Sequence, residues 1–217
     1  MKAVCLVSGG PDSAVAAAMA KKGGYDLYFL SFDYGQIATR ELESAKKIVK
    51  ALGAKEHRVV DISFLKDLYG SGVTALLDED IQMPERFEQS VIVPFRNGIL
   101  LSIAAGYAAT IGADAIFYGA QGDDARFYPD CGQEFVSAIS QAISSGTESK
   151  LTVRNPLGDK TKAVVVKLAV ELGVPLELTW SCYLNLKAHC GRCESCRNRK
   201  LAFKEARVKD PTTYIKP

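Results

Sequence analysis

The sequence has little net charge, no long apolar run, no internal repeat and no low-complexity tract. Its 27 lysines and arginines nearly balance 25 acidic residues, giving a formal net charge of +2, which argues against a broad nucleic-acid-binding surface. The most apolar stretch, Gly98 to Ile111, is too short to span a membrane and contains Ser102, Tyr107 and Thr110. The first residues enter a strand directly, without a signal-peptide pattern. These absences predict a cytoplasmic protein without a membrane segment.

The composition is that of an ordinary globular protein, with 47% hydrophobic and 24% charged residues among 217. This length suits one α/β domain with a substantial core and a small appendage. We expect the α/β domain over residues 1–175 and the appendage over residues 176–217.

Apolar runs bounded by glycine alternate with helical segments, as in a parallel sheet covered on both faces. The pattern predicts a doubly wound α/β fold with ligands at the carboxyl ends of the strands. The expected strands are Ala3–Val7, Tyr25–Phe32, His57–Asp61 and Ala115–Tyr118, and the expected helices are Ala14–Lys22, Arg40–Leu52, Asn97–Ile111 and Thr161–Leu172. Ser63 to Ser90 has weak periodicity and is either a mobile lid over the site or a solvated connection.

A glycine-rich turn, Ser8-Gly9-Gly10-Pro11-Asp12-Ser13, joins the first strand to the first helix. Two glycines let backbone N–H groups approach an anion, and the helix start adds a positive field, so the turn suits a phosphate. Asp12 and Ser13 stand where side chains reach a metal ion or a phosphate oxygen. The lysine of a Walker loop is absent. The alternative is ordinary turn and capping chemistry.

Four cysteines, Cys182, Cys190, Cys193 and Cys196, lie within a short stretch near the end of the chain. Paired thiolates at this spacing predict a structural Zn²⁺ site with four ligands and no open position, in preference to disulfides. His189 is an alternative ligand, although four cysteines suffice. A zinc ribbon for nucleic acid is the functional alternative, which the low net charge disfavours.

Polar residues gather in two loops that we expect at the carboxyl edge of the sheet. Arg96 and Asn97 begin a helix, and a loop with Asp124, Tyr128 and Asp130 follows a buried strand. Carboxylates and aromatic rings suit a purine-like base, and an arginine suits a substrate carboxylate. The alternatives are an N-cap, a surface ion pair and a solvated loop. The lone Cys131 is expected to be a buried structural residue.

The pattern SGGxDS resembles the PP-loop of ATP pyrophosphatases, and the other motifs resemble the 7-cyano-7-deazaguanine synthase (QueC) family. The resemblance spans about residues 2–214 and implies an adenine nucleotide alpha hydrolase-like fold. The motifs that carry it are Phe32-Asp33-Tyr34-Gly35-Gln36, Val93-Pro94 with Arg96-Asn97, Tyr128-Pro129-Asp130-Cys131, Asn155-Pro156-Leu157, Lys162-Ala163 and Thr179-Trp180-Ser181-Cys182-Tyr183 with CGxCxxC.

The resemblance implies that 7-carboxy-7-deazaguanine is adenylated by Mg·ATP, converted by ammonia to an amide, and adenylated again to leave a nitrile. It implies a phosphate site at Ser8, Gly9, Gly10, Asp12 and Ser13, a second phosphate-binding group at Lys162, and adenine near Phe32. It places Arg96, Asn97, Tyr128, Asp130 and, more weakly, Asp124 in the deazaguanine pocket. It also implies a homodimer that acts on small molecules.

The chain departs from the family pattern at several positions. Gln36 is followed by Ile37-Ala38 where the family has Arg-His, and Lys162-Ala163 is followed by Val164 where it has glutamate. Phe95 stands where a small residue is usual. These departures leave open a QueC-like ligase of an antiviral system that joins the deazaguanine acid to a protein amine. A further alternative is a tRNA-modifying PP-loop protein, since such enzymes share the PP-loop.

Overall fold

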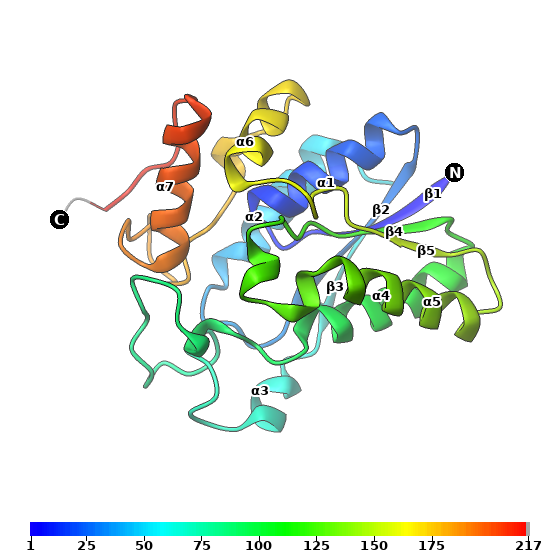
Figure 1. Ribbon diagram of the computed structural model, residues 1–217, viewed down its shortest axis with the longest axis horizontal. Helices are drawn as coiled ribbons and strands as arrows, with labels where there is room; N and C mark the ends of the chain where they lie inside the picture. Colours follow the sequence, from blue (N-terminus) through cyan, green and yellow to red (C-terminus); the bar gives the residue numbers. More distant parts are fainter. Residues whose placement is uncertain (216–217) are drawn as a thin grey trace.

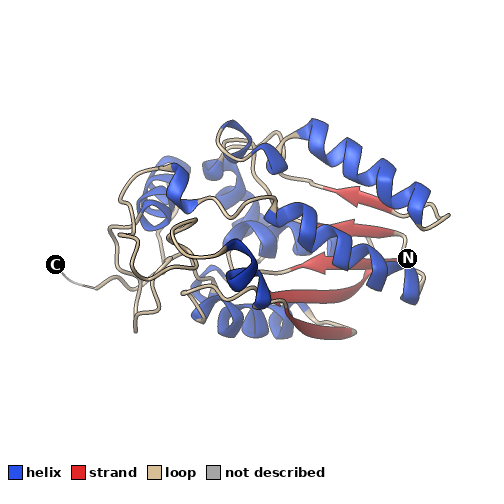
Figure 2. Ribbon diagram, turned by 90° about the horizontal axis from the view of Figure 1, so that it is seen from below, coloured by secondary structure: helices blue, strands red, loops and turns tan. Residues whose placement is uncertain are grey.

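The computed structural model describes residues 1–215 as a five-stranded parallel sheet between two layers of helices (Figures 1 and 2). The strand order is β3-β2-β1-β4-β5, so the chain reverses direction across the sheet between β1 and β4. A crevice forms at the carboxyl ends of the strands at such a point. The strands are β1 (Lys2–Leu6), β2 (Asp26–Asp33), β3 (Glu56–Asp61), β4 (Ala115–Phe117) and β5 (Thr152–Arg154).

The central strand β1 is apolar because both of its faces are covered. Ala3 and Cys5 pack into the cluster on one face, whereas Val4 and Leu6 pack into the cluster on the other, as the two-residue period of a strand requires. The first face is covered by α1 (Pro11–Lys22), α2 (Arg40–Leu52), α6 (Lys162–Glu171) and α7 (Glu194–Ala206), and the second by α4 (Arg96–Ile111) and α5 (Gln133–Gly146), with the short α3 (Phe64–Tyr69) beside them.

The predicted fold class is confirmed, and the eight expected elements are present with ends shifted by at most three residues. The helix Arg40–Leu52 has the expected ends, which its strong amphipathic pattern defines. The sequence analysis did not predict α3, α5, β5 or the helical form of α7. The strand β5 has only three residues, too few to show a two-residue alternation.

One helical stretch, Gln89–Ile111, is long and apolar enough to cross a membrane by length and composition alone, contrary to the expectation from the sequence. The stretch is interrupted at Phe95, whose φ is +52°, so the continuous helix α4 has 16 residues. At 1.5 Å per residue this helix is about 24 Å long, shorter than a typical span. Leu101, Ala104 and Ala108 are fully buried within the protein, so α4 is apolar because it lies in the core.

Candidate active site

The glycine-rich turn packs directly against the start of α2. Gly9 has a φ of +93°, and a Cβ there would lie 2.2 Å from the carbonyl oxygen of Glu41. The backbone N–H of Trp180 donates to the Gly9 carbonyl at 2.9 Å. Position 9 therefore requires glycine, both for its backbone angle and for this close approach.

Two serines close the turn internally. The Ser13 hydroxyl donates to the Gly10 carbonyl at 3.0 Å and accepts from the backbone N–H of Ser8 at 3.2 Å. Within residues 1–215, no side chain caps the first turn of α1, which begins with Pro11. The N–H groups at this helix start are thus left for a ligand, as an anion site requires.

Lys162, the first residue of α6, forms an ion pair with Asp12 of α1, which lies in the same core cluster as α6 on one face of the sheet. Both side chains are largely buried, at 25% and 17% exposure. Burial lowers the pKa of Lys162, but the charges of Asp12 and Asp124 outweigh it, so the pKa is raised and the lysine stays charged. The other oxygen of Asp12, Oδ1, is buried and has no hydrogen-bond partner within residues 1–215. That oxygen is available to a metal ion or a ligand N–H group.

Asp124 belongs to the same group of charges. Burial raises its pKa to about 6, with the charge of Lys162 opposing and that of Asp12 reinforcing the shift. The Gln121 side chain donates to Asp124 Oδ1 at 2.5 Å, and the Lys162 backbone N–H donates to Asp123 Oδ2 at 3.1 Å. The carboxylates of Asp12, Asp123 and Asp124 and the ammonium of Lys162 therefore lie close to the glycine-rich turn.

Asp130 caps the start of α4. Its Oδ2 accepts from the backbone N–H of Asn97 at 3.0 Å, and the Asn97 amide donates to the Asp130 carbonyl at 3.3 Å. The Asn97 amide also donates to Cys131 Sγ at 3.4 Å. Burial raises the pKa of the Cys131 thiol, as a structural cysteine requires.

Arg96 interacts with two groups that the sequence analysis did not assign to the site, Tyr34 and Glu41. Its guanidinium donates to the Tyr34 hydroxyl at 3.0 Å. Burial raises the pKa of Glu41 to about 7, against the opposing charge of Arg96. Nothing in the local sequence distinguishes Glu41 from the other acidic residues of an amphipathic helix.

A cavity of about 450 Å³ joins these groups at the carboxyl edge of the sheet. Gly9 is not among its lining residues, because it packs behind the turn against α2. The predicted residues that line the cavity are Ser8, Gly10, Asp12, Ser13, Phe32, Arg96, Asn97, Asp124, Tyr128, Asp130 and Lys162.

The segment Ser63–Ser90 is partly built into the core. Thr74 and Ala75 are at most 1% exposed, and Leu76 lines the cavity. The ring of Phe87 packs against Phe127 and Tyr128, with centroids 4.2 and 5.6 Å apart. The segment covers the site through these contacts, which a solvated connection would lack.

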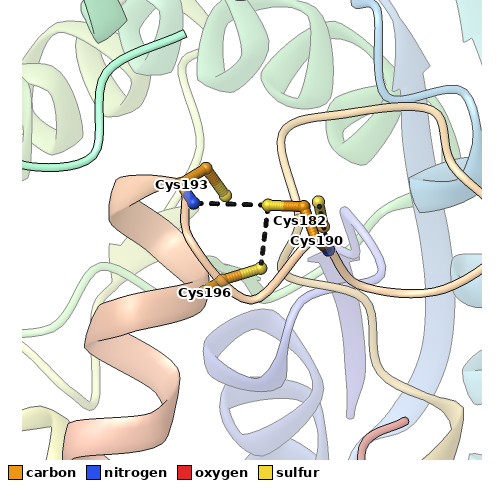
Figure 3. A group of neighbouring side chains, drawn as sticks. All are labelled: Cys182, Cys190, Cys193 and Cys196. Carbon is orange, nitrogen blue, oxygen red and sulfur yellow. Dashed lines mark hydrogen bonds between the residues drawn. The ribbon is translucent and has the colours of Figure 1, made fainter. Parts of the chain in front are cut away.

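The four cysteines near the C-terminus lie together where α7 begins (Figure 3). Their sulfur atoms are all within 4.8 Å of one another, and the sulfurs of Cys190 and Cys196 are 3.8 Å apart. A tetrahedron of sulfurs about 2.3 Å from a central Zn²⁺ has edges of about 3.8 Å, so the group fits such an ion. Backbone N–H groups of Arg192 and Cys193 donate to Cys190 Sγ at 3.4 and 3.2 Å, which would stabilise a thiolate.

His189 lies outside this cluster. Its Nε2 accepts from the backbone N–H of Ser181 at 3.0 Å, and its ring packs on Trp180 with centroids 4.2 Å apart. Burial lowers the pKa of His189 to about 4. The histidine thus supports the fold beside the cluster. None of the six cysteines, all of which lie within residues 1–215, forms a disulfide.

Comparison with known proteins agrees with this geometry. A family model described as "Queuosine biosynthesis protein QueC" matches residues 2–207. A 7-cyano-7-deazaguanine synthase of Sulfurovum sp. (strain NBC37-1) is 44% identical over 222 residues, covering 99% of each chain. A synthase of the same name from Campylobacter hominis is 43% identical over 223 residues, covering 99% of this chain and all of the relative.

Solved structures share the fold at lower identity. An NH3-dependent NAD synthetase from Campylobacter jejuni has a TM-score of 0.53 and 17% identity, covering 82% of this chain and 66% of its own. A 4-thiouridine synthetase in an RNA complex with bound ATP has a TM-score of 0.54 and 21% identity. The match covers 95% of this chain and 50% of the synthetase chain. These solved structures show the PP-loop fold, and the family model and the full-length relatives show that the chain belongs to the QueC family and is an enzyme.

Proposed function

We propose that this protein converts 7-carboxy-7-deazaguanine and ammonia to 7-cyano-7-deazaguanine with the consumption of ATP. The observation that carries the proposal is that the glycine-rich turn, the Asp12–Lys162 pair and Arg96 line the same cavity. Relatives that carry the synthase name over the full chain support the substrate and product.

In this proposal the turn binds the ATP phosphates. The backbone at Ser8, Gly9 and Gly10 and the hydroxyl of Ser13 surround the pyrophosphate, while Phe32, buried at the end of β2, lies beside adenine. Asp12 and Lys162 lie at the reacting phosphate, where the lysine offsets negative charge. Mg²⁺ bound with ATP supplies further neutralisation of the leaving pyrophosphate, and Asp12 Oδ1 is an oxygen ligand of the type it prefers.

The chemistry has two stages. In the first, a substrate carboxylate oxygen attacks the α-phosphorus of ATP, pyrophosphate leaves, and ammonia then displaces AMP to form the amide. In the second, the amide oxygen is adenylated and leaves with AMP as two N–H protons are lost and the nitrile forms. Each ATP converts a poor oxygen leaving group into a good one.

We propose that the deazaguanine lies among Arg96, Asn97, Asp124, Tyr128 and Asp130. The half-buried side chain of Arg96 has only Tyr34 as a hydrogen-bond partner within residues 1–215, so its remaining donors suit the substrate carboxylate. Tyr128 offers an aromatic face for the base. Asn97 and Asp130 bond to each other, so we assign them to fixing the start of α4 at the substrate.

The metal of the cysteine cluster is proposed to be Zn²⁺ in a structural role. Four sulfurs fill a tetrahedral site and leave no position for water or substrate. Residues 176–217 would then form the zinc-binding segment that packs on the ATP pyrophosphatase domain of residues 1–175. We further propose a cytoplasmic homodimer, on the family resemblance alone.

The synthase names of the relatives favour nitrile formation over the protein-conjugating alternative. The test is to incubate the protein with Mg·ATP, ammonium and the carboxylic acid and to follow the products by mass. We expect the nitrile, with two AMP and two pyrophosphate released per molecule. An amide that persists with one AMP released, or no turnover, would contradict the proposal.

A further inference from the structure

The first residue of α7, Glu194, carries a buried carboxylate that the proposed function has not used. Glu194 is 8% exposed. Its Oε2 accepts from the Tyr183 hydroxyl at 2.9 Å, and the Asn198 amide donates to its Oε1. Its backbone N–H donates to the Pro84 carbonyl at 3.0 Å. The carboxylate is therefore fixed in position before any ligand arrives.

The carboxylate belongs to the active-site cavity. Glu194, Tyr183 and Asn198 all line it together with Tyr128. Burial raises the pKa of Tyr128. The negative charges of Glu194 and Asp124 raise it further, and the contribution of Glu194 is the larger of the two. Glu194 therefore lines the same cavity as the aromatic side chain proposed to stack on the base.

Glu194 differs in its partners from Asp12 and Asp130. Like Glu41 and Asp124, which also line the cavity, it forms no ion pair within residues 1–215. Asp12 pairs with Lys162, and Asp130 caps α4. No lysine or arginine nitrogen within residues 1–215 lies within 4.0 Å of Glu194. Burying a carboxylate without a cation is costly, and two neutral donors offset that cost only in part. A ligand with N–H donors would offset the rest.

The chemistry of the substrate supplies such donors. A guanine-type ring presents a ring N–H and an exocyclic amino N–H side by side, and a carboxylate with two oxygens accepts both at once. Each oxygen of Glu194 accepts one protein hydrogen bond and keeps a lone pair for a second.

We propose that Glu194 is the specificity-determining residue that accepts the ring N–H and the 2-amino group of the deazaguanine, an inference that depends on the proposed function. The cysteine cluster positions this residue, because Cys193 immediately precedes α7 and Cys196 lies in its first turn. The metal segment would thus contribute to substrate selection as well as to folding.

The experiment compares binding of 7-carboxy-7-deazaguanine and of its analogue without the 2-amino group by calorimetry. We expect the wild-type protein to bind the amino compound roughly 10- to 100-fold more tightly, because the analogue leaves a buried acceptor unpaired. Glu194→Gln has the same shape but presents an NH₂ to the substrate donors. In this variant we expect the preference to fall below about threefold. The matched control, Glu171→Gln, changes an exposed residue of α6 and should keep the wild-type preference.

Measuring the metal content of Glu194→Gln shows whether this variant retains an intact cysteine cluster. If Glu194→Gln does not fold, Tyr183→Phe removes one donor that orients the carboxylate, and a lower preference is expected there. An unchanged preference in the folded variant, or a change only in the KM for ammonium, would overturn the inference. If the wild-type protein binds neither compound, the proposed function itself fails, so the two failures are distinguishable.

Discussion

At the residue scale, burial and neighbouring charge set the protonation of the cavity side chains. Glu41 and Asp124 have their pKa raised to about 7 and about 6, first by burial, although Arg96 and Lys162 oppose the shift. The cavity therefore gains negative charge as the pH rises from 5 to 8. The two cations stay charged throughout, so the balance between them and the carboxylates depends on pH.

Replacing Asp12 tests the reaction centre. Asp12→Ala removes the partner of Lys162 and the buried oxygen that suits a metal ion. We expect pyrophosphate release to fall by at least about 100-fold, because an electrostatic contact at the reacting phosphate is lost. The circular dichroism spectrum should stay unchanged. Unfolding of the variant would show instead that Asp12 is a structural residue.

Replacing Glu41 tests the pH dependence of stability. Its folded pKa of about 7 lies above its ordinary value of 4.5, so the folded protein binds more protons than the unfolded chain between these values. This contribution to stability is complete below about pH 4.5 and is lost as the pH rises through 7. Glu41→Gln should therefore raise the free energy of unfolding by about 1–3 kcal/mol at pH 8 and by much less at pH 5. Urea denaturation at both pH values measures this, and an equal effect at both would refute it.

At the scale of elements, the site depends on two close backbone contacts. The glycine-rich turn approaches α2, and the loop after β4 approaches the start of α1. In this loop, a Cβ at Gly119 would be 2.5 Å from the Asp12 carbonyl oxygen. These contacts fix the conformation of the turn and of the start of α1.

Alanine substitutions at two glycines with similar φ angles distinguish the cost of backbone strain from the cost of a steric clash. Gly9→Ala combines a φ of +93° with a contact at 2.2 Å to the Glu41 carbonyl, whereas Gly24→Ala has a φ of +80° and nothing within 4 Å. We expect Gly24→Ala to cost about 1 kcal/mol of stability and Gly9→Ala to cost more and to abolish ATP binding. Thermal unfolding and ATP titration measure both. Equal losses of stability would contradict the packing argument.

Removing one thiolate tests the cysteine cluster and α7 together. Cys193 precedes the helix and is 2% exposed. Cys193→Ser should lose the metal and destabilise α7, because metal binding and local folding are coupled. Elemental analysis gives the metal content, and hydrogen exchange of residues 190–208 gives the local stability. Cys5→Ser changes a buried cysteine of β1 far from the cluster and serves as the control for metal content.

At the scale of the whole molecule, α7 joins the C-terminal segment to the sheet domain. Ala202, Phe203 and Ala206 share a core cluster with Val165 and Ala169 of α6. In Figure 1, α7 lies beyond the carboxyl ends of the strands, at the opposite end from the N-terminus. This placement brings Glu194 to the cavity and makes the C-terminal segment part of the site.

The buried Arg199 connects α7 to the segments that flank it in the chain. Arg199 is 1% exposed and donates to Thr179 Oγ1 at 2.8 Å, the Leu176 carbonyl at 3.2 Å and Asp210 Oδ1 at 3.3 Å. Arg199→Leu should cost about 3–5 kcal/mol of unfolding free energy, because it leaves buried acceptors unpaired. Arg197→Leu, which breaks an exposed ion pair with Glu85, should cost about 0–1 kcal/mol. Chemical denaturation compares them, and equal costs would refute the role of Arg199.

From the sequence we could identify the cavity residues that belong to local motifs, but not the residues that pack against them from distant parts of the chain. The turn at Ser8 and the four cysteines were identified from local spacing, since turn geometry and metal ligation depend on residues close in the chain. Glu41 and Glu194 were missed because their significance comes from the residues packed around them, Arg96 in one case and Tyr183 in the other. The short elements α3 and β5 were missed because they show too few turns or alternations.

The sequence by itself determined the parallel α/β fold, the glycine-rich turn and the grouping of four cysteines, because each follows from periodicity or from spacing within a short segment. Only the tertiary structure decided which charges meet. Asp12 and Lys162 are 150 positions apart in the chain, and they pair because α1 and α6 pack on the same face of the sheet. Burial and Coulomb interactions depend on distance in space, so the pairs that shape this cavity exist only once the chain has folded.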